Sequence, residues 1–168
     1  GVDLSEEMLA VAWEKASDLE HPPLFVHQAL EELILPRGVD LAVCALDSLD
    51  YITEPDRCRQ AIRRIYRALN PGGLFVFDVN TPEKLRAMDG HVFLDEDDDV
   101  YCVWRGRFDE ETNICSYGMD LFQRDGRHYL VDDAELLLDA GEGLAVNEVG
   151  HALAHVVAVL HGVPLVVG

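Results

Sequence analysis

Hydrophobic and polar positions near the start of the chain follow helical spacing. Ser5 is a natural N-cap, and the two glutamates after it favour the first turn of a helix. Pro22 and Pro23 end this helix, and the short apolar run 24–26 predicts a buried strand. We expect one face of the helix to be a buried apolar stripe, formed by Met8, Leu9, Ala12, Trp13, Ala16 and Leu19.

The same alternation of strand and helix continues to about residue 80. The run from Val39 to Leu46 predicts a second buried strand. The near-continuous apolar run 74–79 is typical of parallel strands that are covered on both faces. Between them, Pro55 marks a helix start, and a turn is expected at residues 70–73. The alternation predicts βαβ units and a parallel sheet. The inner face of this second helix is formed by Cys58, Ala61, Ile62, Ile65 and Leu69, and the solvent face by Arg57, Arg63, Arg64 and Arg67.

The pattern changes after residue 81. Residues 100–108 and 114–123 are strand-like runs joined by a polar stretch, which predicts an antiparallel hairpin added to the parallel sheet. The acidic run 95–99 precedes it, and adjacent acids in a loop are expected to be solvated rather than to bind a metal.

The four cysteines have no CxxC spacing, which argues against a zinc or redox site. In a hairpin centred on Glu111, Cys102 faces Asp120 and Cys115 faces Arg107. The two cysteines then lie about 16 Å apart along the ladder, beyond disulfide reach. We expect four buried, reduced thiols.

Composition changes again after Arg127, because no Lys or Arg follows it. Residues 134–140 predict a helix. Residues 149–168 contain no Asp, Glu, Lys or Arg and are about as long as a membrane span. Their histidines, glycines and Pro164 favour a buried helix followed by a strand, so we expect no membrane partner. His151 and His155 share a helical spacing but lack a general base between them, and we expect no metal site.

Length and charge narrow the functional classes. The chain has 168 residues and is 49% hydrophobic, which suits one folded domain rather than a disordered segment. Thirteen Lys and Arg against 32 Asp and Glu give a net charge of −19. Such a surface repels the phosphate backbone, so we expect no nucleic-acid partner. Without a signal-peptide pattern, an acidic cytoplasmic protein is expected.

Three predicted strand ends carry polar side chains. Asp3 closes the first strand, Asp47 and Ser48 close the run from Val39, and Asp78, Val79 and Asn80 close the run from Leu74. Open α/β sheets bind ligands beyond the carboxyl ends of their strands. These ends therefore form the candidate ligand site.

Several segments, taken in order, resemble class I S-adenosylmethionine-dependent methyltransferases of the small-molecule branch. Residues 1–9 are similar to the family's second strand, residues 40–51 to its fourth strand, and residues 67–78 to the helix, turn and fifth strand that follow. The acidic loop and hairpin match the same branch, through residues that include Trp104, so the resemblance covers residues 1 to about 127.

The resemblance implies S-adenosyl-L-methionine as cofactor and assigns it residues. Asp3 is expected to hold the ribose hydroxyls, and Leu4 and Met8 to pack on the adenine. The family's acid for the adenine amino group falls at Ala29, with Gln28 beside it.

Asp47 and Ser48 are expected beside the methionine part and the transferred methyl group. Asp47, Asp50 and Tyr51 are candidates for contacting a small-molecule methyl acceptor, or else form a strand-to-helix turn. In-line transfer from an activated methyl needs mainly orientation and exclusion of water, so no catalytic residue is assigned. The hairpin and acidic loop are expected to form a lid or a wall of the acceptor pocket.

The sequence also departs from the family. Its first strand and glycine-rich loop are expected before Gly1, and its signature Asn is Asp50 here. We therefore expect a Rossmann-like, mostly parallel α/β sheet with an added hairpin, truncated at its first strand. The predicted division is a core at 1–127, with the insertion at about 91–124, and a segment at 128–168 of helix plus strand.

Alternatives stay open for the tail and for the activity. Residues 135–141 and 143–146 form the family's last helix and strand, or the tail is unrelated sequence, or it is a permuted first strand and loop. The chain is either a methyltransferase, complete or as an inactive fragment, or a non-catalytic module that keeps the fold. The absence of the glycine-rich loop makes activity doubtful, and the oligomeric state is open.

Overall fold

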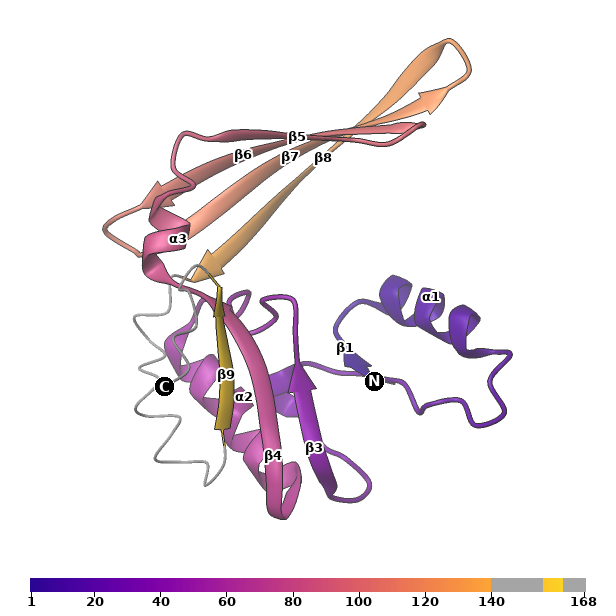
Figure 1. Cartoon of the computed structure of the whole chain (residues 1–168), viewed down its shortest axis with the longest axis vertical. Coiled ribbons are helices and arrows are strands. Elements are labelled where there is room, and N and C mark those ends of the chain that lie inside the picture. The colour runs from indigo at the N-terminus through magenta and orange to yellow at the C-terminus, as the bar shows by residue number, and fades with distance from the viewer. Residues whose placement is uncertain (140–155, 162–168) are drawn as a thin grey trace, which may run out of the picture.

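A computed structural model describes residues 1–139 and 156–161 of the chain. It contains two parallel sheets with their helices and one antiparallel sheet (Figure 1). The elements, in chain order, are β1 (Val2–Asp3), α1 (Glu6–Ala16), β2 (Val26–His27), the 3-10 helix η1 (Leu30–Glu32), β3 (Val39–Cys44), α2 (Pro55–Ala68), β4 (Leu69–Asn80), α3 (Pro82–Arg86), β5 (Val92–Glu96), β6 (Val100–Asp109), β7 (Ile114–Asp125), β8 (His128–Asp139) and β9 (Val156–His161).

The predicted parallel strands are confirmed. β1 pairs with β2, and a three-stranded sheet has the order β3-β4-β9, with all pairs parallel. The predicted inner face of α2 packs against β4, where Phe75 and Phe77 are fully buried and stack with ring centroids 4.9 Å apart. The opposite face of the sheet differs from the expectation, because Leu41 and Val43 of β3 are exposed. Within the described chain, this sheet has one face packed against α2, on which Ala42 and Cys44 of β3 are only partly buried.

The turn predicted at residues 70–73 lies inside the assigned span of β4. The pairing with β3 jumps from Val39 opposite Leu69 to Leu41 opposite Leu74. The four residues 70–73 of β4 thus lie opposite the single residue Asp40 of β3, and Gly72 adopts φ +83°, which favours glycine. The chain turns where predicted, and the regular strand runs from Leu74.

Helix α1 begins as predicted, but its apolar stripe is not buried. The Ser5 hydroxyl accepts a hydrogen bond from Met8 N at 3.1 Å and caps the helix. Within α1 only Ala16 is buried, whereas Met8 and Trp13 are each 60% exposed. Helical spacing predicted the element correctly, but few described residues pack against this face.

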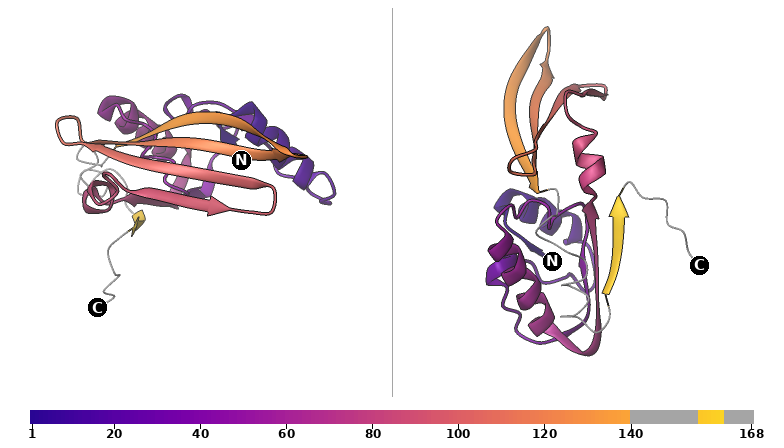
Figure 2. Two further views of the ribbon diagram at one scale, coloured as in Figure 1. Left: turned by 90° about the horizontal axis from the view of Figure 1, so that it is seen from above. Right: turned by 90° about the vertical axis from the view of Figure 1, so that its left-hand side faces the viewer.

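The predicted hairpin is part of a four-stranded antiparallel sheet, in the order β5-β6-β7-β8, which projects away from the α/β part (Figure 2). The expected register was wrong by one residue, since Cys102 faces Leu121 and Cys115 faces Phe108. All four cysteines are free, as predicted, but Cys44 is only partly buried.

The helix predicted at residues 134–140 was wrong. Residues up to Asp139 form β8, which pairs along its whole length with β7. Leu138 is buried in a second small core with Leu85, Phe108 and Cys115, whereas Leu137 is exposed. This period of two is that of a strand, and the predicted segment 128–168 therefore starts with a strand of the antiparallel sheet.

The tail is described only at β9, which lies parallel to β4. The predicted strand at 143–146, His151, His155 and the end of the chain lie outside the described residues. Among the helices of the described part, none is long and apolar enough to cross a membrane.

Candidate functional site between two sheets

Asp3 stands at the carboxyl end of β1, as predicted. Its side chain is exposed, and its Oδ1 accepts a hydrogen bond from Ser5 N at 2.9 Å. His27 of β2 braces the same turn, because its Nε2 lies 2.8 Å from Leu4 O and its Nδ1 lies 3.2 Å from Glu6 Oε1. The carboxylate at position 3 is therefore held at the surface by its neighbours.

Leu4 and Met8 leave apolar surface beside this carboxylate. Both side chains are largely exposed, on the turn after β1 and on the first turns of α1. Such surface can pack against a planar apolar group.

Gln28 and Ala29 follow β2 but differ in what they offer. The Gln28 side chain accepts a hydrogen bond from Ile34 N at 3.2 Å, and its Nε2 donates to Ile34 O at 3.4 Å. The amide thus bridges the two ends of the loop between Gln28 and Ile34. Ala29 precedes η1 and has no polar side chain, so only its backbone can contact a ligand polar group.

The turn after β3 is strained and held from β4. Leu46 and Asp47 adopt φ of 60° and 58°, a left-handed conformation that is costly for non-glycine residues. The Asp78 carboxylate accepts hydrogen bonds from both of their backbone N–H groups, each at 3.1 Å. Ser48 Oγ donates to Ala45 O at 2.7 Å. Asp78 therefore positions Asp47, a role that its place at a predicted strand end did not indicate.

Asp50 lies beneath this turn and is 2% exposed. Its Oδ2 accepts hydrogen bonds from Asn80 N at 2.8 Å and Asn80 Nδ2 at 2.9 Å, and its backbone O accepts one from Asp139 N at 2.8 Å. Burial raises the pKa of Asp50 to about 6, and the carboxylates of Asp47 and Asp139 add to the rise, against the Asn80 hydrogen bonds. Asp50 thus joins the ends of β3, β4 and β8.

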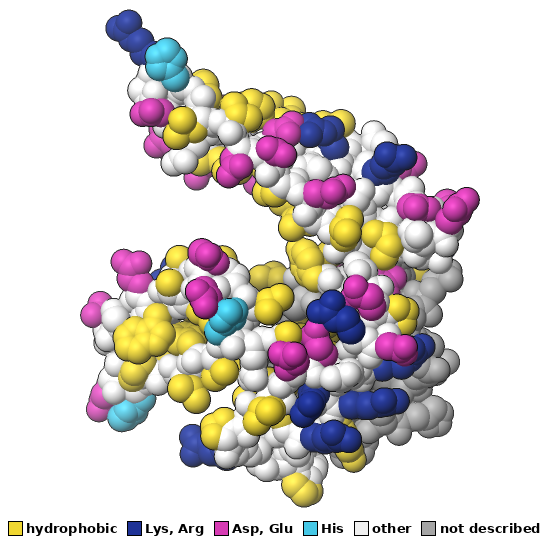
Figure 3. All heavy atoms as spheres, turned by 180° about the vertical axis from the view of Figure 1, so that it is seen from behind, with side chains coloured by type: hydrophobic (Ala, Val, Ile, Leu, Met, Phe, Trp, Pro, Cys, Tyr) yellow, Lys and Arg dark blue, Asp and Glu magenta, His cyan; other side chains and the backbone are white. Residues whose placement is uncertain are grey.

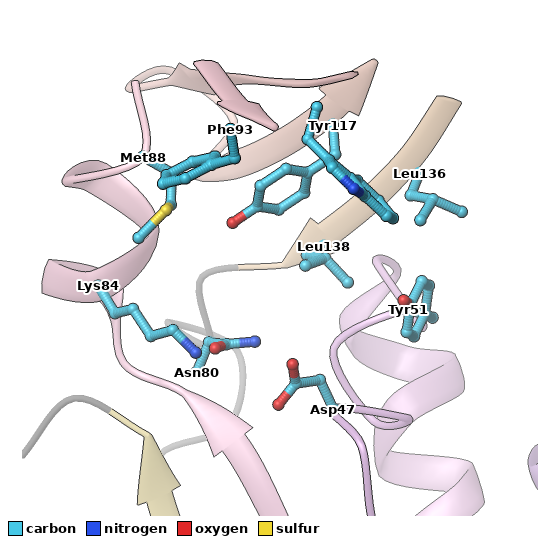
Figure 4. Close-up of a pocket in the computed structure, with 10 residues that line it drawn as sticks. Asp47, Tyr51, Asn80, Lys84, Met88, Phe93, Tyr117, Leu136 and Leu138 are labelled. Atoms are coloured by element: carbon cyan, nitrogen blue, oxygen red, sulfur yellow. The ribbon is translucent and has the colours of Figure 1, made fainter. Parts of the chain in front are cut away.

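A cavity of about 380 Å³ opens above this network, between the strand ends and the antiparallel sheet (Figure 4). The space-filling view shows the molecule hollowed between these two parts (Figure 3). Asp47 and Tyr51 approach from the β3 side, and Asn80 and Lys84 from the end of β4 and from α3. The remaining lining residues are mostly aromatic or apolar: Met88, Phe93, Trp104, Tyr117, Leu136 and Leu138.

The predicted residues are brought together only in part. Asp47 and Tyr51 line the cavity, and Asp50 lies buried below it. Asp3, Leu4 and Met8 belong to the β1–β2 side, which is a separate sheet. The hairpin forms one wall, through Trp104 of β6 and Tyr117 of β7, whose rings meet edge to face at 6.5 Å.

No sequence pattern singled out Lys84, Met88, Phe93 or Leu136 as cavity-lining residues. Phe93 lies on β5, next to the acidic run, and Leu136 lies in the segment predicted to be a helix. The sequence offered one signal for the two leucines that line the cavity. If residues 134–140 are taken as a strand, Leu136 and Leu138 lie on the same face of it.

The two tyrosines that line the cavity are held in their neutral form. Burial raises the pKa of Tyr117, with Cys115, Asp47 and Tyr51 adding to the rise, and burial, Asp47 and Asp50 raise that of Tyr51. Both phenols therefore stay protonated near neutral pH. Burial likewise raises the pKa of the Cys44 thiol to about 11, so it is no thiolate nucleophile. No cluster of potential metal ligands occurs in the described part of the chain.

The family model and the curated proteins that match this chain are described as methyltransferases. A family model described as a methyltransferase domain matches residues 1–73. The chain is similar to "Putative methyltransferase YqeM" of Bacillus subtilis (strain 168), with 30% identity over 131 residues, which cover 77% of this chain and 53% of that protein. The chain spans about half the length of the curated relatives it matches.

Solved structures show the same fold. A S-adenosylmethionine-dependent methyltransferase from Clostridium acetobutylicum ATCC 824 matches with a TM-score of 0.80 and 30% identity, over 90% of this chain and 61% of that one. CalS10, an amino pentose methyltransferase from Micromonospora echinaspora solved with SAM bound, matches with a TM-score of 0.70 and 21% identity, over 92% of this chain and 63% of that one. The second likeness concerns the fold alone. The predicted Rossmann-like α/β class is confirmed.

Proposed function

We propose that the chain is a class I S-adenosylmethionine-dependent methyltransferase, which binds S-adenosyl-L-methionine and transfers the methyl group to a small-molecule acceptor in the cavity. The methyltransferase-domain model that matches residues 1–73 and the fold shared with S-adenosylmethionine-dependent methyltransferases support this proposal. The observation that carries this proposal is the position of Asp47, which the strained turn after β3 places on the cavity wall. Ligands of open α/β sheets bind at such strand ends.

The residues around β1 fit the nucleoside part of the cofactor. A carboxylate can accept two hydrogen bonds from vicinal hydroxyls, and Asp3 is exposed at the strand end where this is needed. Leu4 and Met8 offer exposed apolar surface for the adenine. Gln28 fits less well, since its amide is engaged with Ile34, and Ala29 can contribute its backbone. Asp47 and Ser48 are assigned to the methionine end.

When bound, the cofactor supplies a methyl group on a sulfonium, and an acceptor lone pair forms the new bond to carbon as the C–S bond breaks and leaves a thioether. The protein has to align the acceptor and exclude water. The aromatic walls, with Trp104 and Tyr117, suit this task. Tyr51 and Tyr117 stay protonated, so the Asp47 carboxylate is the group on the cavity wall that can take the proton released by the acceptor.

Thermal unfolding with S-adenosyl-L-methionine tests the proposal. Ligand at about 100 times its Kd stabilises a folded protein by about 2.7 kcal/mol, which raises the midpoint visibly. Asp3→Asn is expected to weaken binding at least tenfold, because one ionised acceptor for the ribose hydroxyls is lost. The matched control is Asp18→Asn, the same charge change on an exposed residue beyond α1, which should leave binding unchanged.

A midpoint that does not move at millimolar cofactor contradicts the proposal for this chain. That result favours the alternative hypothesis, that the chain is a non-catalytic module with a methyltransferase fold.

A further inference from the structure

The side-chain amide of Asn80 is oriented by the buried carboxylate below it. Asn80 is 4% exposed, and its Nδ2 and backbone N both donate to Asp50 Oδ2, at 2.9 and 2.8 Å. A carboxylate oxygen accepts hydrogen bonds and an amide oxygen cannot donate one, so this contact fixes which end of the amide faces Asp50. The amide oxygen Oδ1 is left on the other side.

This oxygen has no hydrogen-bond donor among the described residues, although it is buried. A buried acceptor without a partner costs about 1–3 kcal/mol, and native structures contain few of them. Asn80 also lines the 380 Å³ cavity. An acceptor that is fixed, buried and unsatisfied at a cavity wall is suited to a donor that a ligand brings.

The other lining groups define the body of that ligand. The walls include the rings of Phe93, Trp104 and Tyr117 and the side chains of Leu136 and Leu138, which favour a compact apolar or ring-shaped group. Lys84 lines the same cavity without an ion pair to any described residue. Asp47 stands on the cavity wall at the end of β3.

We propose that Asn80 Oδ1 accepts a hydrogen bond from the hydroxyl or amino group of the methyl acceptor and thereby selects acceptors with such a donor on a compact apolar body. This inference rests on the proposed function and names the substrate class of that site. Asp50 is then a positioning residue, which keeps the Asn80 oxygen turned toward the ligand.

Binding of matched ring compounds tests this selection. The chain has two tryptophans, Trp13 on exposed α1 and Trp104 in the cavity, so Trp13→Phe leaves Trp104 as the reporter of the site. The probes are cyclohexanol, cyclohexylamine and methoxycyclohexane, followed by Trp104 fluorescence with S-adenosylhomocysteine present. The ether has the same ring and oxygen as the alcohol but no donor.

We expect the alcohol, the amine or both to bind about threefold to tenfold more tightly than the ether, the size of one net hydrogen bond. The tighter of the two identifies the acceptor as a hydroxyl or an amino compound. In Asn80→Leu the preference over the ether should disappear. Lys84→Met, a change at another lining residue of the same cavity, should retain it.

Equal binding of all three probes to the Trp13→Phe protein overturns the proposal, and this comparison does not depend on any Asn80 variant folding. A preference that survives in Asn80→Leu and disappears in Lys84→Met also overturns it, since Lys84 is then the recognising group. Calorimetric binding of S-adenosylhomocysteine alone is measured in parallel. Failure of that binding contradicts the proposed function, whereas failure of the probe comparison contradicts only the role of Asn80.

Discussion

The β3–β4 side and the β1–β2 side of the candidate site are held by different kinds of contact. On the β3–β4 side, Asp47 is positioned by the Asp78 carboxylate, and Asn80 by Asp50, all above the core packed on α2. On the β1–β2 side, α1 buries only Ala16.

Contacts between distant segments thus position the residues of the β3–β4 side, whereas a local hydrogen bond orients Asp3 on the β1–β2 side. The β3–β4 residues depend on contacts between segments about thirty residues apart, such as Asp50 with Asn80. The Asp3 carboxylate accepts a local hydrogen bond from Ser5 N, two residues away, on a turn that His27 of β2 also contacts. The first arrangement forms only when the domain folds, whereas the hydrogen bond between Ser5 and Asp3 can form and break locally.

The largest predicted effect comes from the core under the β3–β4 side. Phe75→Ala should lower the free energy of unfolding by about 3–5 kcal/mol, because it removes a fully buried ring stacked on Phe77. Trp13→Ala, a large aromatic deletion on α1, should cost less than about 0.5 kcal/mol. Urea unfolding measures both. If both variants lost the same free energy of unfolding, α1 would pack as tightly as α2, and the contrast between the β1–β2 and β3–β4 sides would not hold.

A smaller effect, of opposite sign, is expected at Asp50. Its pKa of about 6 lies above the ordinary value near 3.9, so its contribution to stability is full below about pH 4 and is lost as the pH rises through 6. Asp50→Asn keeps an acceptor for Asn80 and carries no charge. We expect the variant to match the wild type at pH 4 and to exceed it by about 1–3 kcal/mol at pH 7.

The control for this titration is Asp18→Asn on the exposed surface, for which urea unfolding from pH 4 to 7 should give a difference that does not change with pH. An Asp50→Asn effect of the same size at pH 4 and pH 7 would contradict a raised pKa. It would point instead to a change in packing around Asn80.

The features that the sequence predicted correctly have local causes. The cap at Ser5, the proline at the start of α2 and the acids at the strand ends each depend on neighbouring residues. The β8 strand was missed because its leucines allow both a helix and a strand, and pairing with β7 decides between them. The hydrogen bond between Asn80 and Asp50 could not be predicted for the same reason, since the two residues are thirty positions apart.

The smallest effect tests the local character of the β1–β2 side. Ser5→Ala removes the hydroxyl that caps Met8 N, a loss of about 1 kcal/mol for the helix. Because α1 buries little surface, we expect amide exchange within α1 to accelerate about fivefold while the urea midpoint stays unchanged. Ser116→Ala on β7 is the control and should leave α1 exchange as it is. If Ser5→Ala lowered the urea midpoint instead, α1 would unfold with the core, and Asp3 would be positioned by the same packing as Asp47.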